Sequence, residues 1–360
     1  MLGIEVLAKH LVIGGSGFIG SNLVARLLSR GERVTVFDNL SRHGVDVNLQ
    51  WLQTLDSGSQ LTFCLGDIRD AEAVSAVAQD ADVIYHLAAQ TAVTTSVENP
   101  REDYEINATG TFNVLEAARQ SDRNPIFIYA STNKVYGGMD EVDVVEQGTR
   151  YAYQDKPLGI DETTPLDFHS PYGCSKGAGD QYTRDYARIY GLRSVVARQS
   201  CIFGPRQFGT EDQGWLAWFF IAAAKNQPLT VYGDGKQVRD LLYIDDLLDF
   251  YDLAVENIER VKGKIYNVGG GPQNSMSVWS ELKPHIDGLF QRQVSADYAP
   301  WRPGDQRIYV SDIRRAAMDL GWRPKTDLQE GLARLYDWVQ ELLGAASPQD
   351  LEKKAALMYR

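Results

Sequence analysis

The chain has 360 residues, of which 44% are hydrophobic and 23% are charged, an ordinary composition for a folded globular protein that excludes collagen, coiled coil and disorder. Its 48 acidic residues outnumber its 36 Lys and Arg, giving a formal net charge of −12, and no basic run interrupts the acidity, which argues against nucleic-acid binding. Three widely spaced cysteines and five histidines without paired spacing argue against a disulfide framework and predict no metal site.

Short apolar runs alternate with helical patterns through the first 200 residues, an arrangement typical of βαβ units in a parallel sheet. The predicted strands are His10–Ile13, Arg33–Asp38, Leu61–Asp67, Asp82–Ala89, Pro125–Thr132 and Ser194–Gln199. Between the first two strands, Ile19–Arg30 repeats apolar residues at helical spacing, and Gly31 ends the helix. We therefore predict an α/β fold with a doubly wound parallel sheet of the Rossmann type over residues 1–200.

After about residue 200 the alternation gives way to aromatic and loop-rich stretches, which predicts a smaller mixed α/β domain over residues 201–344. This part contains a buried helix at Trp215–Ala224 and a short strand at Lys264–Val268. The helix is the longest uninterrupted apolar run, yet it is far shorter than the ~20 residues that cross a bilayer. No cleavable signal pattern is visible at the N-terminus, so we expect a cytoplasmic protein that does not contact membranes. Residues 345–360 are predicted to form a polar tail.

A glycine-rich turn joins the first strand to the first helix. Gly14, Gly17 and Gly20 allow a tight turn, close approach to a pyrophosphate and close packing of helix on strand, and the helix N-terminus offers free N–H groups to the anion. The second strand ends at Asp38, where a carboxylate can accept hydrogen bonds from an adenosine ribose. This favours NAD over NADP, although Arg42 lies nearby. The alternative is that Asp38 only caps a turn.

Two Tyr-x-x-x-Lys pairs are present. Tyr232 and Lys236 enclose Gly-Asp-Gly, a turn signal that breaks the helix needed to align them. Tyr172 and Lys176 lie in a stretch with helical spacing, with Pro171 suited to its first turn. This second pair shares one helical face, where a lysine ammonium would stabilise a phenolate and lower the pKa of the tyrosine from about 10.

A hydroxyl group completes the predicted catalytic set. The strand Pro125–Thr132 ends in Ser131 and Thr132, and Thr132 is suited to hydrogen-bond the same substrate oxygen as Tyr172. A strand-end threonine can also serve only as a local cap. We predict Thr132, Tyr172 and Lys176 as the catalytic residues.

These motifs together resemble the extended short-chain dehydrogenase/reductase family, the NAD-dependent epimerases and dehydratases of nucleotide sugars. The matching stretches run in the family's order from residue 11 to about residue 340. They are Gly14–Gly20, Phe37–Arg42, Gly66–Ile68, His86–Ala89, Asn107, Ser131–Gly137, Ser170–Lys176, Gly204–Arg206 and Val238–Asp240.

The resemblance implies an NAD-binding domain over residues 1–200, which carries the catalytic helix, and a substrate domain mainly over 201–344 that can interleave with it. The residues expected to bind NAD are Gly14, Gly17, Phe18, Ile19, Asp38, Asn39, Ser41, Arg42, Asp67, Ile68, Leu87, Ala88, Ala89, Asn107, Tyr172 and Lys176. Those expected to bind a nucleotide-diphosphate sugar are Thr132, Asn133, Arg239 and Arg302, since guanidinium forks suit phosphate oxygens.

Within the family, Ser131–Gly137, Leu166–Lys176 and Gly204–Gly214 resemble members that interconvert CDP-paratose and CDP-tyvelose, two CDP-3,6-dideoxyhexoses, at C2. The dehydratases carry an Asp-Glu pair after the threonine, and this chain has Asn133 and Lys134 there, so dehydration is not expected. Many relatives also have an asparagine at the position of Cys201 that contacts the diphosphate.

The resemblance therefore implies an isomerase that oxidises the sugar to a 2-keto form and returns the hydrogen from the opposite face. Two alternatives stay open: a UDP-hexose 4-epimerase, which needs the same residues, and a non-catalytic NAD-binding sensor or scaffold. A homodimer or homotetramer is expected from the family. The roles of Lys134 and Cys201 do not follow from the sequence.

Overall fold

The computed structural model describes residues 8–56, 58–302 and 304–344. Its largest sheet is parallel throughout, with the strand order β12-β8-β5-β4-β1-β2-β3. The strands are β1 (Lys9–Ile13), β2 (Arg33–Asp38), β3 (Leu61–Leu65), β4 (Val83–His86), β5 (Ile126–Thr132), β8 (Arg193–Gln199) and β12 (Lys264–Val268). The predicted doubly wound sheet is confirmed. The strands expected over 61–67 and 82–89 end two and three residues earlier, because the chain turns away there into loops at the carboxyl edge.

The position of β12 in the fold differs from the position that we expected from the sequence. We assigned Lys264–Val268 to the C-terminal part, but it pairs in parallel with β8 and forms one edge of the large sheet. A short apolar run carries no information about which sheet it joins. The chain therefore returns to the first sheet after residue 200, and the domain boundary at that residue stays a prediction.

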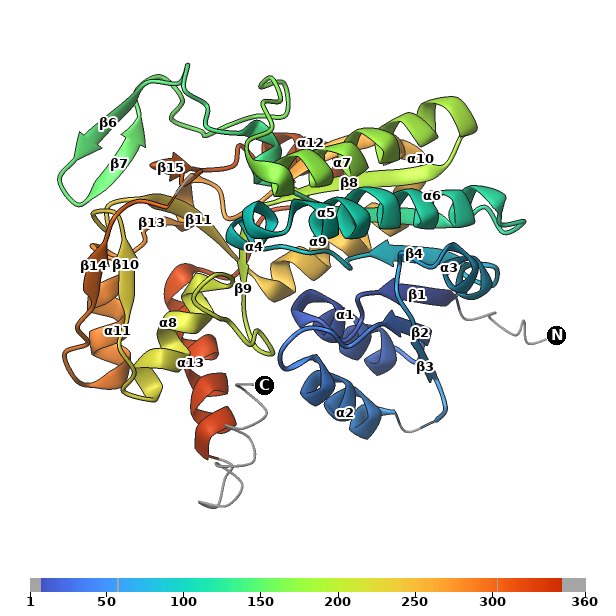
Figure 1. Ribbon diagram of the computed structural model, residues 1–360, viewed down its shortest axis with the longest axis horizontal. Helices are drawn as coiled ribbons and strands as arrows, with labels where there is room; N and C mark the ends of the chain where they lie inside the picture. Colours follow the sequence, from blue (N-terminus) through green and yellow to red (C-terminus); the bar gives the residue numbers. More distant parts are fainter. Residues whose placement is uncertain (1–7, 57, 303, 345–360) are drawn as a thin grey trace.

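Side chains that alternate along the central strands contribute to two separate hydrophobic cores, one on each face of the large sheet. Val12, Val36 and Ile128 point to the face covered by α1 (Phe18–Ser29), α2 (Val45–Leu55) and α9 (Ile244–Glu256). Leu11 and Phe127 point to the opposite face, covered by α3 (Ala71–Ala78), α6 (Thr111–Gln120) and α7 (Ser170–Tyr190). Since side chains alternate along a strand, one run of apolar residues supplies both cores, and helices cover both faces (Figure 1).

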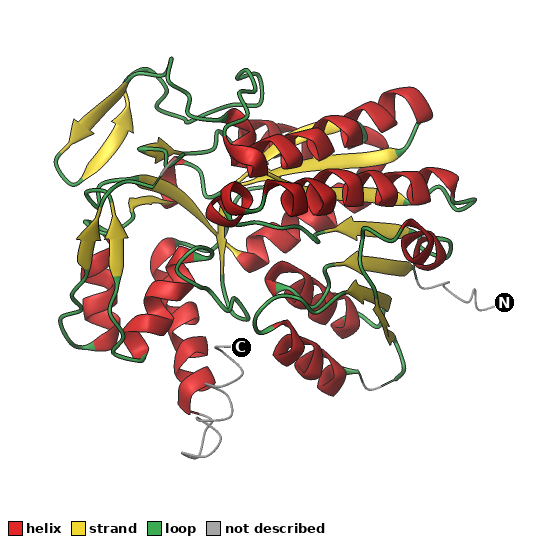
Figure 2. Ribbon diagram, viewed as in Figure 1, coloured by secondary structure: helices red, strands yellow, loops and turns green. Residues whose placement is uncertain are grey.

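The rest of the chain forms smaller sheets and helices beside the large sheet (Figure 2). One sheet contains β9 (Cys201–Phe203), β11 (Val238–Tyr243), β13 (Ser275–Ser277) and β15 (Ile308–Tyr309). Two others pair β10 (Thr230–Tyr232) with β14 (Asp297–Ala299) and β6 (Val144–Gln147) with β7 (Arg150–Tyr153). The helices here are α8 (Trp215–Ala224), α11 (Leu282–Phe290) and α13 (Leu328–Gly344). The expected buried helix has the predicted bounds, because apolar residues surround its axis and bury it.

Short helices fill the connections. They are α4 (Val93–Glu98), α5 (Pro100–Tyr104), α10 (Ile258–Val261) and α12 (Arg314–Leu320), with a π-helical segment at Glu105–Gly110 and 3₁₀ turns at Asn133–Tyr136 and Pro272–Asn274. None of the helices in the described ranges is long and apolar enough to span a membrane. The predicted polar tail, 345–360, lies outside the described residues.

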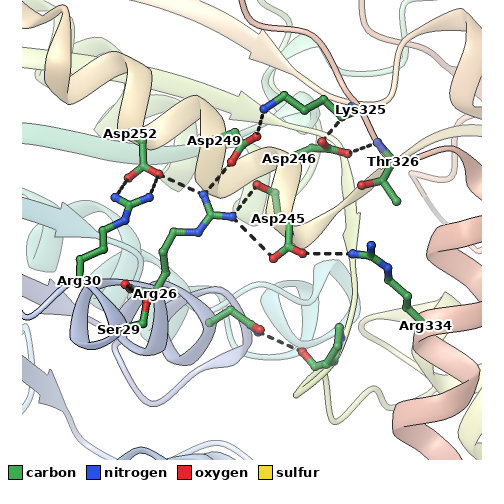
Figure 3. Close-up of polar contacts among 12 residues, drawn as sticks. Arg26, Ser29, Arg30, Asp245, Asp246, Asp249, Asp252, Lys325, Thr326 and Arg334 are labelled. Carbon is green, nitrogen blue, oxygen red and sulfur yellow. Dashed lines mark hydrogen bonds and ion pairs between the residues drawn. The ribbon is translucent and has the colours of Figure 1, made fainter. Parts of the chain in front are cut away.

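A network of ion pairs joins helices that are more than 200 residues apart in sequence (Figure 3). The Arg26 guanidinium of α1 donates to Asp249 and Asp252 of α9 at 2.8 and 3.0 Å, and Arg30 contacts Asp252 at 2.5 Å. Arg334 of α13 reaches Asp245 of α9 at 3.4 Å. Helix α9 follows directly from β11, so these pairs hold the smaller sheet against α1 and the large sheet.

We expect Arg26→Ala to lower the free energy of unfolding by about 2 kcal/mol, because it leaves neighbouring carboxylates without their shared partner. Urea unfolding measures the change, and about 1 M NaCl should reduce it by screening. Arg101→Ala is the matched control, since Arg101 is 85% exposed and pairs only with Glu105, four residues on. It should cost about 0.5 kcal/mol or less. Equal losses for both variants would contradict this role of the network.

Candidate active site

The candidate site lies at the carboxyl edge of the large sheet, beside β1 and β4. The order of strands reverses there, because β2 and β3 lie on one side of β1 and β4 and β5 on the other. Loops that leave adjacent strands at such a point diverge to opposite faces and open a crevice. The loops after β1, β2 and β4 and the end of β5 carry most of the predicted site residues.

The glycine turn after β1 has no room for side chains. Gly14 has φ +81°, and a Cβ atom there would lie 2.6 Å from the backbone N of Ala88. A Cβ at Gly20 would lie 2.2 Å from the Gly14 carbonyl oxygen. The turn therefore brings α1 directly against β1, with the free N–H groups of its first turn facing the crevice edge, and no acidic side chain occupies that first turn. This cradle fits a dinucleotide pyrophosphate.

Asp38 stands at the end of β2, next to the glycine turn. Its carboxylate accepts the Ser16 N–H at 3.0 Å and the Leu40 N–H at 2.9 Å, so it also organises the local turn, as the alternative interpretation required. Burial raises the pKa of Asp38, while these two N–H donors and Arg42 oppose the rise. Arg42 itself donates to the Thr91 hydroxyl at 2.9 Å. The carboxylate is thus anchored at the position where an adenosine ribose would bind.

Other residues expected to bind the cofactor surround this groove in different ways. The Asn39 amide donates to Asp67 at 2.9 Å, and Arg69 also grips Asp67, holding its pKa well below the usual range. Ser41 is exposed beside Asn39, and Ile68 is buried under α6. The N–H groups of Leu87 and Ala88 donate to the Ile13 carbonyl, and Ala89 follows them. Phe18 and Ile19 line the adjoining cleft.

The side chain of Asn107 is buried and hydrogen-bonds other groups of the protein. It accepts the Gln90 N–H and donates to the Gln90 carbonyl, both at 2.9 Å, and it donates to Asp103 at 3.0 Å. The side chain therefore fixes the loop after β4. Its predicted contact with the cofactor stays a prediction.

Thr132, Tyr172 and Lys176 come together as predicted. Tyr172 and Lys176 lie one turn apart on α7, which begins at Ser170 with Pro171 in its first turn. Thr132 ends β5 and lines the same cleft as Tyr172, and its hydroxyl accepts the Lys134 N–H at 3.2 Å. All three side chains are buried, and the Lys176 ammonium lies 4.3 Å from the centre of the Tyr129 ring.

The predicted lowering of the Tyr172 pKa by Lys176 is not found in the protein alone. Burial raises the pKa of Tyr172 to about 12, opposed by the neighbouring Thr132 hydroxyl and the charge of Arg42. Burial also lowers the pKa of Lys176 to about 7, while Asp180 and Asp103 raise it. Desolvation outweighs charge at both groups, a balance that the Tyr-x-x-x-Lys motif alone does not reveal.

The second Tyr-x-x-x-Lys pair has no helix. Tyr232 ends β10, and its hydroxyl donates to Glu211 at 2.8 Å, whereas Lys236 lies beyond the turn and pairs with Glu146. Their side chains are bound to different partners, so they cannot act as one unit. Tyr232 nevertheless lines the cleft next to the catalytic residues.

This cleft has a volume of about 410 Å³ and is lined by residues from the first 200 residues and from the rest of the chain. Its walls include Thr132, Tyr172 and all the residues expected to bind substrate: Asn133, Arg239 and Arg302. The Arg302 guanidinium lies 3.6 Å from the centre of the Tyr232 ring and 3.4 Å from Asp212.

Several other residues of the cleft were not assigned from the sequence. The Lys134 ammonium donates to the Gly304 carbonyl at 3.3 Å, and burial together with Arg239 lowers its pKa to about 8. Cys201 also lines the cleft, and burial raises the pKa of its thiol. Trp215 lines it from the first turn of α8. No local motif marks Trp215, because only the tertiary fold brings α8 beside β5.

We expect the protein to bind NAD more tightly than NADP, and Asp38→Ala to weaken NAD binding about tenfold or more, because it removes charge-assisted hydrogen bonds to the ribose. The gap between the two cofactors should then close. Dissociation constants measured on protein stripped of cofactor test this. Asp80→Ala, at an exposed position outside the groove, should change neither constant. Equal affinity of the unaltered protein for both cofactors would rule out the role given to Asp38.

Comparison with known proteins identifies the family of the chain. The model of the family described as "NAD dependent epimerase/dehydratase family" matches residues 10–269. The chain is 45% identical over 341 residues to CDP-paratose 2-epimerase of Salmonella typhi, covering 93% of this chain and 100% of that one. It is 34% identical to a putative UDP-glucose 4-epimerase of Methanocaldococcus jannaschii, covering 92% and 98%. The solved structure of Thermus thermophilus UDP-glucose 4-epimerase in complex with NAD matches with a TM-score of 0.75 and 32% identity, covering 92% and 99%. The chain therefore belongs to the NAD-dependent epimerase/dehydratase family and is an enzyme that uses NAD.

Proposed function

We propose that this enzyme is an isomerase that interconverts CDP-paratose and CDP-tyvelose by inverting C2 of the sugar. The observation that carries the proposal is that Thr132 and Tyr172 line one cleft in which the two residues after Thr132, Asn133 and Lys134, are not carboxylic acids. The similarity to the Salmonella typhi enzyme supports the choice of sugar nucleotide.

One arginine of the cleft supports an anionic substrate. Lys134, Arg239 and Arg302 line the walls together with three carboxylates, Glu211, Asp212 and Asp305, and Arg302 pairs with Glu211 and Asp212. Among the described residues, no carboxylate lies within ion-pair distance of the Arg239 guanidinium, which donates to the Val238 carbonyl at 2.8 Å. A guanidinium group without a carboxylate partner in a cleft can bind the negatively charged oxygens of a diphosphate.

The proposed reaction follows from the acidity of the substrate. The proton on a C2 carbon that bears a hydroxyl, without an adjacent carbonyl, is too weakly acidic for a side chain to remove. NAD, when bound, supplies the oxidation by accepting the hydrogen that leaves C2 and later returning it. Tyr172 takes the proton of the C2 hydroxyl and gives it back, and Thr132 orients that oxygen. Lys176 supplies positive charge beneath Tyr172, which favours the phenolate at the moment of transfer.

Inversion requires the 2-keto sugar to turn between the two transfers. The diphosphate stays held by Arg239 and Arg302 while the sugar presents its other face to Tyr172. Asn133 and Lys134 stand beside Thr132 at the reacting end of the cleft. Because neither side chain is a carboxylic acid, the pair does not supply the acid and base of a dehydratase.

A 4-epimerase of a UDP-hexose is the second candidate. The identity to the Methanocaldococcus jannaschii protein favours it, and Thr132, Tyr172 and Lys176 serve C4 as well as C2. The two reactions differ in which sugar carbon lies beside Tyr172.

A homodimer or homotetramer is part of the proposal. The exposed aromatic residues Phe112 of α6 and Tyr182 and Tyr190 of α7 lie on neighbouring helices, with Phe112 and Tyr182 in edge-to-face contact at 6.0 Å. We expect a second copy of the chain to pack on this face.

The proposed function is tested by incubating the enzyme with CDP-, UDP- and dTDP-sugars in D₂O and determining C2 and C4 by NMR. We expect inversion at C2 of CDP-paratose and CDP-tyvelose, with almost no deuterium at C2, because the hydrogen moves through bound cofactor and not through solvent. Inversion at C4 of UDP-sugars alone would select the second candidate. Full deuterium incorporation at C2 would instead indicate proton abstraction and would implicate Lys134.

We expect Tyr172→Phe to lower kcat about 10³-fold, since it removes the group that carries the proton, while the dissociation constant for NAD stays near its original value. Tyr232→Phe is the control, because it removes the hydroxyl of the other Tyr-x-x-x-Lys pair and keeps the ring beneath Arg302. Activity in the Tyr172 variant combined with its loss in the Tyr232 variant would reverse the assignment of the two pairs.

A further inference from the structure

A buried carboxylate lies next to the catalytic helix and is not used in the reaction above. Asp103, on α5, has no exposed surface. The Ser175 hydroxyl donates to its Oδ2 at 2.5 Å, and the Asn107 amide donates to its Oδ1 at 3.0 Å. Among the described residues, no ammonium or guanidinium group lies within ion-pair distance of it. Both bonded neighbours are neutral, although a buried carboxylate normally has a charged partner.

Ser175 connects this carboxylate to the catalytic pair. It lies between Tyr172 and Lys176 on α7, and its hydroxyl is also 3.2 Å from the Tyr172 carbonyl oxygen. The charge of Asp103 raises the pKa of both Tyr172 and Lys176. The short π-helical segment after α5 carries Asn107, whose amide also donates to the Ser175 hydroxyl at 3.2 Å, so the two groups that touch Asp103 are bonded to each other.

The other groups that face the catalytic pair include one more carboxylate. Asp180 lies one turn after Lys176 on α7 and also raises the pKa of Lys176, and it pairs with Arg198 of β8 through two hydrogen bonds of 2.9 Å. From β4, His86 is buried and its pKa is lowered to about 3, so it is neutral. From β5, Tyr129 offers the face of its ring. On the cofactor side, Arg42 adds positive charge near Tyr172.

We propose that Asp103 is a positioning residue of the proposed reaction, whose buried negative charge, held through Ser175 and Asn107, keeps Lys176 in its ammonium form beneath Tyr172. A buried ammonium without a compensating charge loses its proton readily. Asp180 and Asp103 both raise the pKa of Lys176, but Asp180 also pairs with Arg198, whereas Asp103 has no ionic partner among the described residues. The inference rests on the proposed function only for the roles of Tyr172 and Lys176, and it does not depend on the identity of the sugar.

The sign of the effect is determined by the charge. Asp103→Asn keeps a side chain of the same shape that can hydrogen-bond Ser175 but removes the negative charge. The pKa of Lys176, already about 7, then falls further, and the pKa of Tyr172 falls with it. The two limbs of the activity profile report apparent pKa values of the Tyr172–Lys176 pair, and because both pKa values fall, both limbs move to lower pH.

The test compares pH profiles of kcat and kcat/KM for three NAD-loaded variants. Asp103→Asn should shift both limbs by about one pH unit to the acid side. Ser175→Ala removes the hydrogen bond but keeps the charge, so its limbs should stay in place even if its rate falls. Asp103→Glu keeps the charge and should restore the original limbs. A purely structural role would lower rates in all three variants without moving the limbs, and that result would overturn the proposal.

A second measurement applies if Asp103→Asn has no measurable turnover. The near-ultraviolet absorbance of the phenolate, taken as the difference between each protein and its Tyr172→Phe counterpart, follows Tyr172 ionisation without substrate. It should titrate at lower pH in Asp103→Asn than in the original protein. An unchanged titration would refute the role of Asp103. Failure of every sugar to react, together with a shifted titration, would refute the proposed function and leave this inference standing.

Discussion

The buried ion pair between Asp180 and Arg198 joins the catalytic helix to the sheet, and the geometry of the site depends on it. The Arg198 guanidinium of β8 grips the Asp180 carboxylate of α7 with two hydrogen bonds of 2.9 Å, and Ser131 donates to the same carboxylate at 2.7 Å. Ser131 directly precedes Thr132 on β5. One buried pair therefore sets the distance between the strand that carries Thr132 and the helix that carries Tyr172.

The same pair extends to the rest of the fold. Arg198 also donates to the Tyr136 hydroxyl at 3.0 Å, and Tyr136 donates to Asn267 of β12 at 2.8 Å. A buried pair is costly to desolvate and adds little to stability, but breaking it leaves an uncompensated charge. Its value here is geometric, because it fixes helix, sheet and cleft in one arrangement. Asp103 beside α7 and Arg239 in the cleft have no ionic partner among the described residues, and the proposed mechanism has them act on Lys176 and on the substrate.

Much of this arrangement is predictable from the sequence, for reasons that differ between elements. The strands of the first half are visible because both faces are buried, so their apolar runs are continuous and bounded by turns. The glycine turn and Tyr172–Lys176 are visible because backbone space and helical spacing demand particular residues at fixed intervals. Family resemblance supplied Arg239 and Arg302, which lie far from these motifs in the sequence and line the same cleft in the structure.

What the sequence did not reveal depends on contacts between distant segments. The edge position of β12 depends on which strand it pairs with, and that is not encoded in its five residues. The raised pKa of Tyr172 comes from burial by the whole fold, which a four-residue motif does not describe. Asp103 carries no motif, and only the packing of α5 against α7 brings its carboxylate to Ser175.

The most direct test of this account is a crystal structure of the Tyr172→Phe variant with NAD and CDP-paratose bound. The substitution stops turnover and so preserves the substrate in place. The account predicts that C2 of the sugar lies beside the Thr132 hydroxyl and the ring at position 172, with the diphosphate on Arg239. A sugar bound with C4 at that position, or a diphosphate away from Arg239, would contradict it.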